Sequence, residues 1–193
     1  MKIILASVSK RRSAILSSCG IRHSVVKSGI EEDMRGKSPV NIAVKNACLK
    51  AKAVSEKITS GYVIGADTVV LLGRTIIGKP RDAAHAKKML KGMSGKTISV
   101  YTGLCVINSV TGKKVSGYEK TGVKVKKIKP SEILKYFKLL GPYDKAGGFS
   151  IEGVGSFIFD DIKGSYFNVL GLPTAKLSDM FRKLGTDILK SVK

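Results

Sequence analysis

Three short polar segments interrupt apolar stretches that are typical of β-strands, and their residue types suit the binding of phosphate. The segments are Ser7-Val8-Ser9-Lys10-Arg11-Arg12, Gly65-Ala66-Asp67-Thr68 and Asp144-Lys145-Ala146-Gly147-Gly148. Ser9 is a candidate N-cap, which would place two arginines in the first turn of the following helix. Because a helix already carries partial positive charge at its N-terminus, arginines there favour a bound anion. A solvated basic face is the alternative, and this segment alone leaves both interpretations open.

Asp67 is the unusual residue of the second segment, because it interrupts a run that otherwise reads as a buried strand. A carboxylate in that position is costly unless it is paired, hydrogen-bonded or bound to a metal. Glu31-Glu32-Asp33 forms a second acidic group. Asp67 could instead cap a turn or pair with an arginine, and the acidic group could be an exposed turn. Taken together, the acids and the arginines would supply oxygen ligands for magnesium and cations for phosphates.

Two further lysines stand beside residues that bend the chain. Lys79 lies between Gly78 and Pro80, and Lys145 precedes Ala146-Gly147-Gly148. A lysine acts as a point charge on phosphate oxygens, and glycines let the backbone approach a ligand closely. Simple turns are the alternative at both places.

Strand-like and helix-like segments alternate along the chain. The sequence predicts strands at Lys2–Ala6, Ser24–Lys27, Tyr62–Leu72, Thr97–Ile107, Gly122–Ile128 and Ser156–Asp160. It predicts helices at Ser9–Cys19, Pro39–Lys57, Asp82–Leu90, Ser131–Leu140 and Thr174–Leu184. This alternation indicates an α/β fold with a mixed sheet, which could be long and bent around a groove.

Length and composition favour one domain with a substantial core, because 193 residues with 43% hydrophobic content can bury one. Two small lobes around a cleft are compatible with that size. The apolar run at the N-terminus is too short for a signal peptide, and no stretch reaches the length of a membrane span. We therefore expect a cytoplasmic protein without membrane association. Cys19, Cys48 and Cys105 are widely spaced, which favours buried free thiols over a disulfide framework or a zinc site.

The formal net charge is +21. Such a charge attracts polyanions nonspecifically and does not choose among them. The densest basic run, Lys124–Lys129, contains no aromatic residues on which bases could stack. We interpret it as solvated surface, so nucleic acid would bind only nonspecifically, if at all.

The order of the motifs along the chain resembles the Maf family of nucleoside triphosphate pyrophosphatases, over residues 3 to about 184. Besides the three segments above, the resemblance includes Gly78-Lys79-Pro80-Arg81-Asp82-Ala83 and Asn168-Val169-Leu170-Gly171-Leu172-Pro173. It implies an inosine-triphosphatase-like fold, with an elongated mixed sheet, flanking helices and a cleft between two lobes of one domain at residues 1–193. It also implies a homodimer and cleavage between the α- and β-phosphates of a nucleoside triphosphate, with Mg²⁺ or Mn²⁺ as cofactor.

The resemblance also implies roles for individual residues. Asp67 matches the proton acceptor, and Glu32 matches an acidic residue that acts in catalysis and, with Asp67, in metal binding. The remaining matches are to substrate-binding positions, namely Ser7, Arg11, Arg12, Lys50, Thr68, Lys79, Lys145 and Glu152.

Three of these positions bear on the choice of base. Arg11 and Thr68 resemble the branch that acts on dTTP and UTP, whereas Glu152 resembles the branch that acts on 7-methyl-GTP. A carboxylate only accepts hydrogen bonds, while the amide of glutamine also donates them. We therefore expect dTTP or UTP as substrate, with 7-methyl-GTP or a broader set of modified nucleotides as the alternative. A basic nucleic-acid-binding or septum-associated regulatory protein is the non-enzyme alternative.

Overall fold

The computed structural model describes residues 1–36, 38–140, 147–148 and 150–192. Within them, seven strands form one sheet in the order β2-β1-β3-β5-β6-β7, with β4 paired to β3. The strands are β1 (Ile3–Leu5), β2 (Ser24–Val25), β3 (Tyr62–Leu72), β4 (Thr75–Ile77), β5 (Thr97–Asn108), β6 (Lys114–Val125) and β7 (Phe159–Lys163). β1 runs parallel to β2 and β3, whereas the β3–β4 and β6–β7 pairs are antiparallel. The predicted α/β fold with a mixed sheet is confirmed.

Three of the described α-helices, α1 (Lys10–Ser18), α2 (Pro39–Ser55) and α3 (Ala83–Met93), begin at a capping side chain that the sequence offers. The other described helices are α4 (Pro130–Leu140), α5 (Tyr166–Val169) and α6 (Thr174–Lys183), with 3₁₀ helices η1 (Gly153–Ile158) and η2 (Ile188–Ser191). The side chains of Ser9, Ser38 and Asp82 each accept a backbone N–H of the helix that follows. The described part of the chain has no helix of the length and apolarity needed to cross a membrane.

Two predicted strands differ most from the structure, while β2 is shorter than the predicted Ser24–Lys27 and β4 was not predicted. β6 begins at Lys114, well before the predicted start at Gly122. The predicted strand Ser156–Asp160 is wrong for its first part, because Ser156 lies in η1 and β7 starts only at Phe159. The cause is local, since Gly153 adopts a φ of +59° and Ser156 Oγ donates to the Gly153 carbonyl at 2.7 Å, which closes a helical turn.

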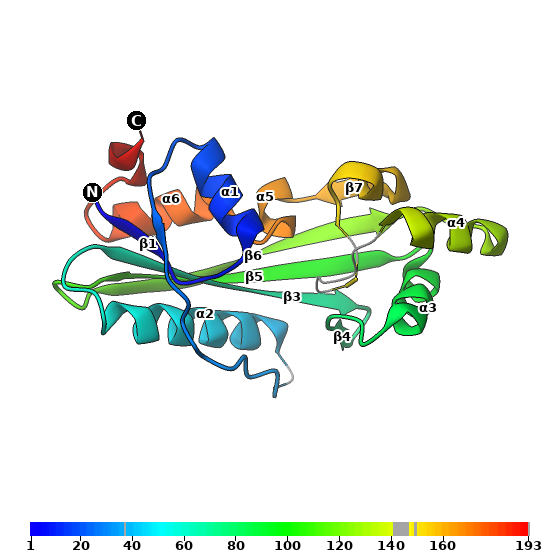
Figure 1. Ribbon diagram of the computed structural model, residues 1–193, viewed down its shortest axis with the longest axis horizontal. Coiled ribbons are helices and arrows are strands. Elements are labelled where there is room, and N and C mark those ends of the chain that lie inside the picture. The colour runs from blue at the N-terminus through cyan, green and yellow to red at the C-terminus, as the bar shows by residue number, and fades with distance from the viewer. Residues whose placement is uncertain (37, 141–146, 149, 193) are drawn as a thin grey trace. The chain divides into compact units, whose positions relative to one another are not determined.

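The chain divides into two compact units, and we describe each by itself. The first comprises Met1–Thr68, Tyr101–Glu119 and Phe167–Lys193, and the second comprises Val69–Val100 and Lys120–Tyr166. In the first unit, α2 covers one face of the sheet, while α1 and α6 cover the other (Figure 1). In the second unit, α3 packs against α4, and α4 against η1. The cleft between two lobes stays a prediction.

Two glycines set the depth at which α2 lies on the sheet of the first unit. A Cβ atom at Gly65 of β3 would collide with the Ala47 carbonyl, and one at Gly103 of β5 would collide with the backbone of Ala43. Ala43, Ala47 and Ala51 are fully buried at this contact. The helix backbone therefore lies directly on the strands, and the side chains that α2 sends toward β3 have fixed positions.

Candidate active site

The first polar segment lies where β1 stops and β3 continues. The last ladder bond joins the Ala6 N–H to the Ile64 carbonyl at 2.8 Å, after which the chain turns toward α1. The Ala66 carbonyl of β3 consequently lacks a partner from β1. Arg12 Nη1 donates to this carbonyl at 3.0 Å. The guanidinium thus supplies the hydrogen bond that a neighbouring strand would otherwise give.

Arg12 ties this edge to three other parts of the first unit. Its Nε donates to the Gly171 carbonyl at 2.8 Å, Nη1 to Ser7 Oγ at 3.1 Å and Nη2 to Thr68 Oγ1 at 3.0 Å. The side chain is buried, and burial lowers the pKa of Arg12, against which Asp67 and Glu32 raise it. Four of its five N–H groups are therefore used within the protein, which leaves at most one for a phosphate.

Asp67 and Thr68 are neighbours on β3 and face opposite sides of the sheet, because side chains alternate along a strand. Thr68 faces Arg12, and its Oγ1 lies 3.0 Å from that of Thr102, whose hydroxyl donates to the Asn168 carbonyl at 3.0 Å. Asp67 instead faces α2. The two neighbouring residues thus take part in two different clusters.

The cluster on the α2 side joins two carboxylates through one ammonium group. Lys50 Nζ donates to Asp67 Oδ1 at 2.7 Å and to Glu32 Oε1 at 2.6 Å. The side chains of Lys50 and Asp67 are 8% and 5% exposed, whereas that of Glu32 is 52% exposed. Because Lys50 and Asp67 are both buried, removal of either side chain would leave the charge of the other unpaired in the protein interior. Of the three side chains in this cluster, Glu32 is the one that solvent reaches.

Asn46 holds the second oxygen of Asp67, and sequence reasoning missed it. Its Nδ2 donates to Asp67 Oδ2 at 3.1 Å and to the Asp33 carbonyl at 3.2 Å, while its Oδ1 accepts the Asp33 N–H at 2.9 Å. The available signal was the spacing, because Asn46 and Lys50 are four residues apart and share one face of α2 with buried alanines.

Within the acidic group Glu31-Glu32-Asp33, the carboxylates of Glu32 and Asp33 have different partners. The Asp33 carboxylate accepts from Arg35 at 2.9 Å and from Lys45 at 2.8 Å, and these two hydrogen bonds lower its pKa. Asp33 thereby fixes the loop to α2, while Glu32 reaches Lys50.

Asp67 and Glu32 form a donor set that fits a divalent cation shared with a substrate. The described residues contain no group of three or more His, Cys, Asp or Glu that could hold a metal on its own. Mg²⁺ commonly takes only one or two carboxylates, with waters and substrate phosphates completing its coordination. Asp67 and Glu32 supply two carboxylates, one of them half exposed, and in this structure both accept from the Lys50 ammonium.

The other predicted site residues lie elsewhere or outside the described residues. Arg11 is partly buried beside Arg12 at the start of α1, and its charge lowers the pKa of Arg12. Lys79 and Glu152 are exposed residues of the second unit, where Glu152 Oε2 accepts from Ser150 Oγ at 3.3 Å. Lys145 lies outside the described residues. Ser7, Arg12 and Thr68 are thus together, as are Lys50, Asp67 and Glu32.

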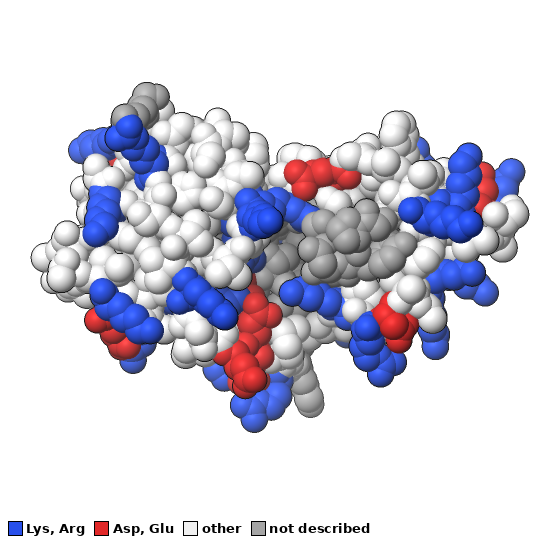
Figure 2. All heavy atoms as spheres, viewed as in Figure 1, with Lys and Arg blue, Asp and Glu red and all other residues white. Residues whose placement is uncertain are grey.

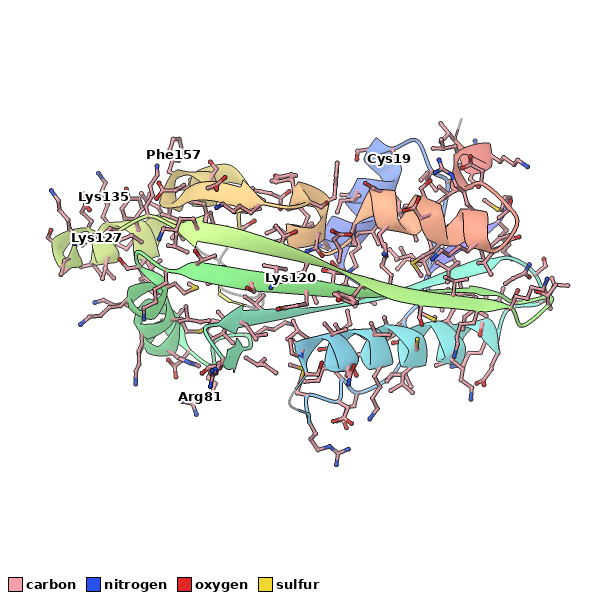
Figure 3. All side chains as sticks on the ribbon, turned by 180° about the vertical axis from the view of Figure 1, so that it is seen from behind. Cys19, Arg81, Lys120, Lys127, Lys135 and Phe157 are labelled. Carbon is pink, nitrogen blue, oxygen red and sulfur yellow. The ribbon has the colours of Figure 1, made fainter. Side chains whose placement is uncertain are left out.

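Basic side chains are spread over the visible face and form no single patch (Figure 2). Within the second unit, Lys120 on β6 lies apart from Lys127 and Lys135, which are near and on α4 (Figure 3). This distribution favours the interpretation of the lysines as solvated surface.

Comparison with known proteins gives one consistent family. The family model of Maf-like proteins matches residues 2–184. Proteins named dTTP/UTP pyrophosphatase are similar to this chain, at 41% identity in Thermoanaerobacter sp. (strain X514) and 42% in Aquifex aeolicus, each alignment covering 95% of this chain and 96% of the relative. The relative of that name in Clostridioides difficile is 40% identical, with 95% of both chains covered. A solved nucleoside-triphosphatase / dITP/XTP pyrophosphatase from Mycobacterium abscessus aligns with 96% of this chain and 97% of its own, at a TM-score of 0.46 and 14% identity. The match over nearly the whole chain, with relatives above 40% identity, means that the protein belongs to the Maf family.

Proposed function

We propose that the protein is a nucleoside triphosphate pyrophosphatase that hydrolyses dTTP and UTP to the nucleoside monophosphate and pyrophosphate. The observation that carries this proposal is the pair of neighbours on β3: Asp67 is held in a buried carboxylate–lysine cluster, and Thr68 is held by Arg12. The family membership and the names of the relatives support the same activity.

The triphosphate would bind at the N-terminus of α1. Ser9 caps this helix through the Arg12 N–H, and other first-turn N–H groups offer donors to phosphate oxygens. Arg11 adds positive charge beside them. Arg12 acts mainly as a positioning residue, because its guanidinium is committed to Ser7, Thr68 and two carbonyls.

Asp67 is our candidate for the proton acceptor. Water attacks the α-phosphorus, the bond from that phosphorus to the bridging oxygen breaks, and the water proton passes to Asp67. Both oxygens of Asp67 are oriented, by Lys50 and by Asn46, so the carboxylate cannot rotate away. Lys50 also supplies a positive charge that a phosphate could share. A divalent cation, Mg²⁺ or Mn²⁺, would be held by Glu32 and Asp67 and would neutralise charge on the triphosphate.

The base preference for dTTP and UTP is favoured by the names of the relatives and by Arg11 and Thr68. One observation favours 7-methyl-GTP as a second candidate substrate. Glu152 is an exposed carboxylate that can only accept hydrogen bonds, and it lines a surface pocket of the second unit with Asp160, Asp161 and Tyr166.

A panel of dTTP, UTP, CTP and 7-methyl-GTP, each with Mg²⁺ or Mn²⁺, tests the proposal. We expect pyrophosphate from dTTP and UTP at a kcat/KM at least about tenfold above that for the other two. Highest activity on 7-methyl-GTP would support the second candidate. No hydrolysis of any nucleotide by the folded protein would contradict both. A homodimer and a cytoplasmic location remain further predictions of the proposal.

A further inference from the structure

Cys48 of α2 and Cys105 of β5 face each other across the contact between the helix and the sheet. Gly103 of β5 meets α2 at Ala43. Five residues from Ala43 to Cys48 advance about 7.5 Å along a helix, and two residues from Gly103 to Cys105 advance about 7 Å along a strand on the same face. α2 and β5 run in the same direction in Figure 1, so these two advances bring the cysteines to the same level.

Burial agrees with this placement. Cys105 belongs to the buried apolar cluster under α2, together with Ala47 and Ala51, and Cys48 packs against that cluster from its rim. All three cysteines are free, but only Cys105 is fully buried, while Cys19 and Cys48 are partly exposed. The expectation of buried thiols is therefore correct only for Cys105. Cys48 is the member of the pair that solvent can reach.

The strand next to β5 places polar groups beside the same pair. The β5–β6 hairpin closes with the Asn108 N–H donating to the Lys113 carbonyl at 2.9 Å. Continued along the ladder, this register sets Ser116 opposite Cys105, with Lys114 two residues before it on the same face. Cys48 thus has a hydroxyl, an ammonium group and a second thiol as neighbours.

These neighbours favour the thiolate of Cys48. The hydrogen bond with the Cys105 thiol, together with the Lys114 charge and the Ser116 hydroxyl, lowers the pKa of Cys48 to about 6 despite its partial burial. The same hydrogen bond and burial raise the pKa of Cys105. One thiol of the pair is therefore prepared to react first, while the other stays protonated beside it.

We propose that Cys48 and Cys105 form a peroxide-reactive pair, in which Cys48 is oxidised first and Cys105 then closes an intramolecular disulfide. The Cys48 thiolate sulfur attacks one peroxide oxygen, the O–O bond breaks, hydroxide leaves, and Cys48 becomes a sulfenic acid. The Cys105 sulfur then attacks the Cys48 sulfur, and the sulfenic oxygen leaves as water with the Cys105 proton. A dithiol reductant reverses the disulfide by exchange.

Oxidation of the pair should also affect the candidate active site, and this consequence rests on the proposed function. Cys48 lies on α2 between Asn46 and Lys50, which hold Asp67. Because Gly65 and Gly103 leave no space between α2 and the strands, a bond from Cys48 to Cys105 constrains the segment that orients the carboxylate. We expect the disulfide to change the hydrolysis rate in a way that the reductant restores.

The experiment treats the full chain at pH 7 with a small excess of hydrogen peroxide, blocks remaining thiols with iodoacetamide, and identifies tryptic peptides by mass spectrometry. We expect a Cys48–Cys105 cross-linked peptide with Cys19 alkylated, and no cross-link after reduction. Cys19 is the internal control, because it is also partly exposed. Because its neighbours lower the pKa of Cys48, we expect Cys48 to react with iodoacetamide about tenfold faster than Cys19 at pH 7.

The Cys105→Ser variant separates the two steps, because its hydroxyl can still donate a hydrogen bond to Cys48 but cannot form a disulfide. It should accumulate a Cys48 sulfenic acid that dimedone traps, without any intramolecular disulfide. Oxidation of Cys48 that leaves the Cys105 thiol intact in the wild type would overturn the proposal, as would equal reactivity of Cys48 and Cys19. Both readouts are independent of hydrolysis, so a protein without pyrophosphatase activity can still show the pair, and an active enzyme can lack it.

Discussion

Replacing Asp67 with Asn tests the cluster on the α2 side, because the change keeps the side-chain volume and removes the charge. Asp67 Oδ1 accepts from Lys50 at 2.7 Å, and Oδ2 accepts from Asn46 at 3.1 Å. An asparagine has a single acceptor oxygen, so its NH₂ group must face one of these two donors. Asn46 cannot turn to offer its own oxygen, since Oδ1 already accepts the Asp33 N–H at 2.9 Å.

The magnitude follows from this conflict. One buried donor facing another costs about 1–3 kcal/mol, and we expect the free energy of unfolding to fall by that amount. The loss is smaller than for an isolated buried pair, because Lys50 keeps Glu32 as a partner at 2.6 Å. Activity should fall further, with kcat lower by roughly 100-fold or more, because the variant lacks the proton acceptor.

Urea denaturation measures the first effect, and dTTP hydrolysis at saturating metal and substrate measures the second. Asp179→Asn is the matched control, because it removes a carboxylate from an exposed ion pair with Arg182 on α6. We expect that control to change stability by less than about 0.5 kcal/mol and to leave kcat unchanged. A stable Asp67→Asn protein with near-normal kcat would refute the assignment of Asp67 and the reading of its hydrogen bonds.

Four further predictions follow from the same structure. Arg12→Lys cannot reproduce the fork to four oxygens, so urea denaturation should show a loss of about 2 kcal/mol or more, and an unchanged midpoint would contradict the positioning role. Gly103→Ala should lower stability by about 1–3 kcal/mol, because the added Cβ collides with α2. Gly92→Ala in α3 should raise stability by about 0.5–1 kcal/mol, because a Cβ there makes only ordinary contacts. A change of the same sign in both variants would contradict the packing of α2 on the strands. Glu152→Gln should shift the kcat/KM ratio toward dTTP and UTP by about tenfold, and an identical substrate profile would remove Glu152 from base selection. The alkylation rate of Cys48 should rise with pH through a midpoint of about 6, because only the thiolate reacts and its fraction grows as pH passes the pKa; a midpoint above 8 would show that its neighbours do not favour the thiolate.

Local sequence signals predicted much of the fold because they act within one turn or one strand. Ser9 and Asp82 cap helices as expected, and the run around Asp67 is the buried strand β3. One local signal was missed: Gly153 and Ser156 close a turn, so η1 replaces part of a predicted strand.

In the candidate site, contacts between distant segments were the part that the sequence did not reveal. The cost of a buried carboxylate pointed to Asp67, but its partner Lys50 entered only through the family resemblance, because pairing across α2 and β3 leaves no mark in either segment. Asn46 was missed as well, because its spacing from Lys50 indicates a shared face of α2 but not the strand residue that the face contacts. The internal use of Arg12 depends on β1 ending before β3, which no residue near Arg12 reveals.

Hydrolysis of dTTP in heavy-oxygen water is the most direct measurement of the central claim that this site directs water to the α-phosphorus. The folded protein, with Mg²⁺ or Mn²⁺, is expected to release dTMP and pyrophosphate in equal amounts, with the heavy oxygen in dTMP alone. Release of dTDP and orthophosphate, or heavy oxygen in pyrophosphate, would contradict it.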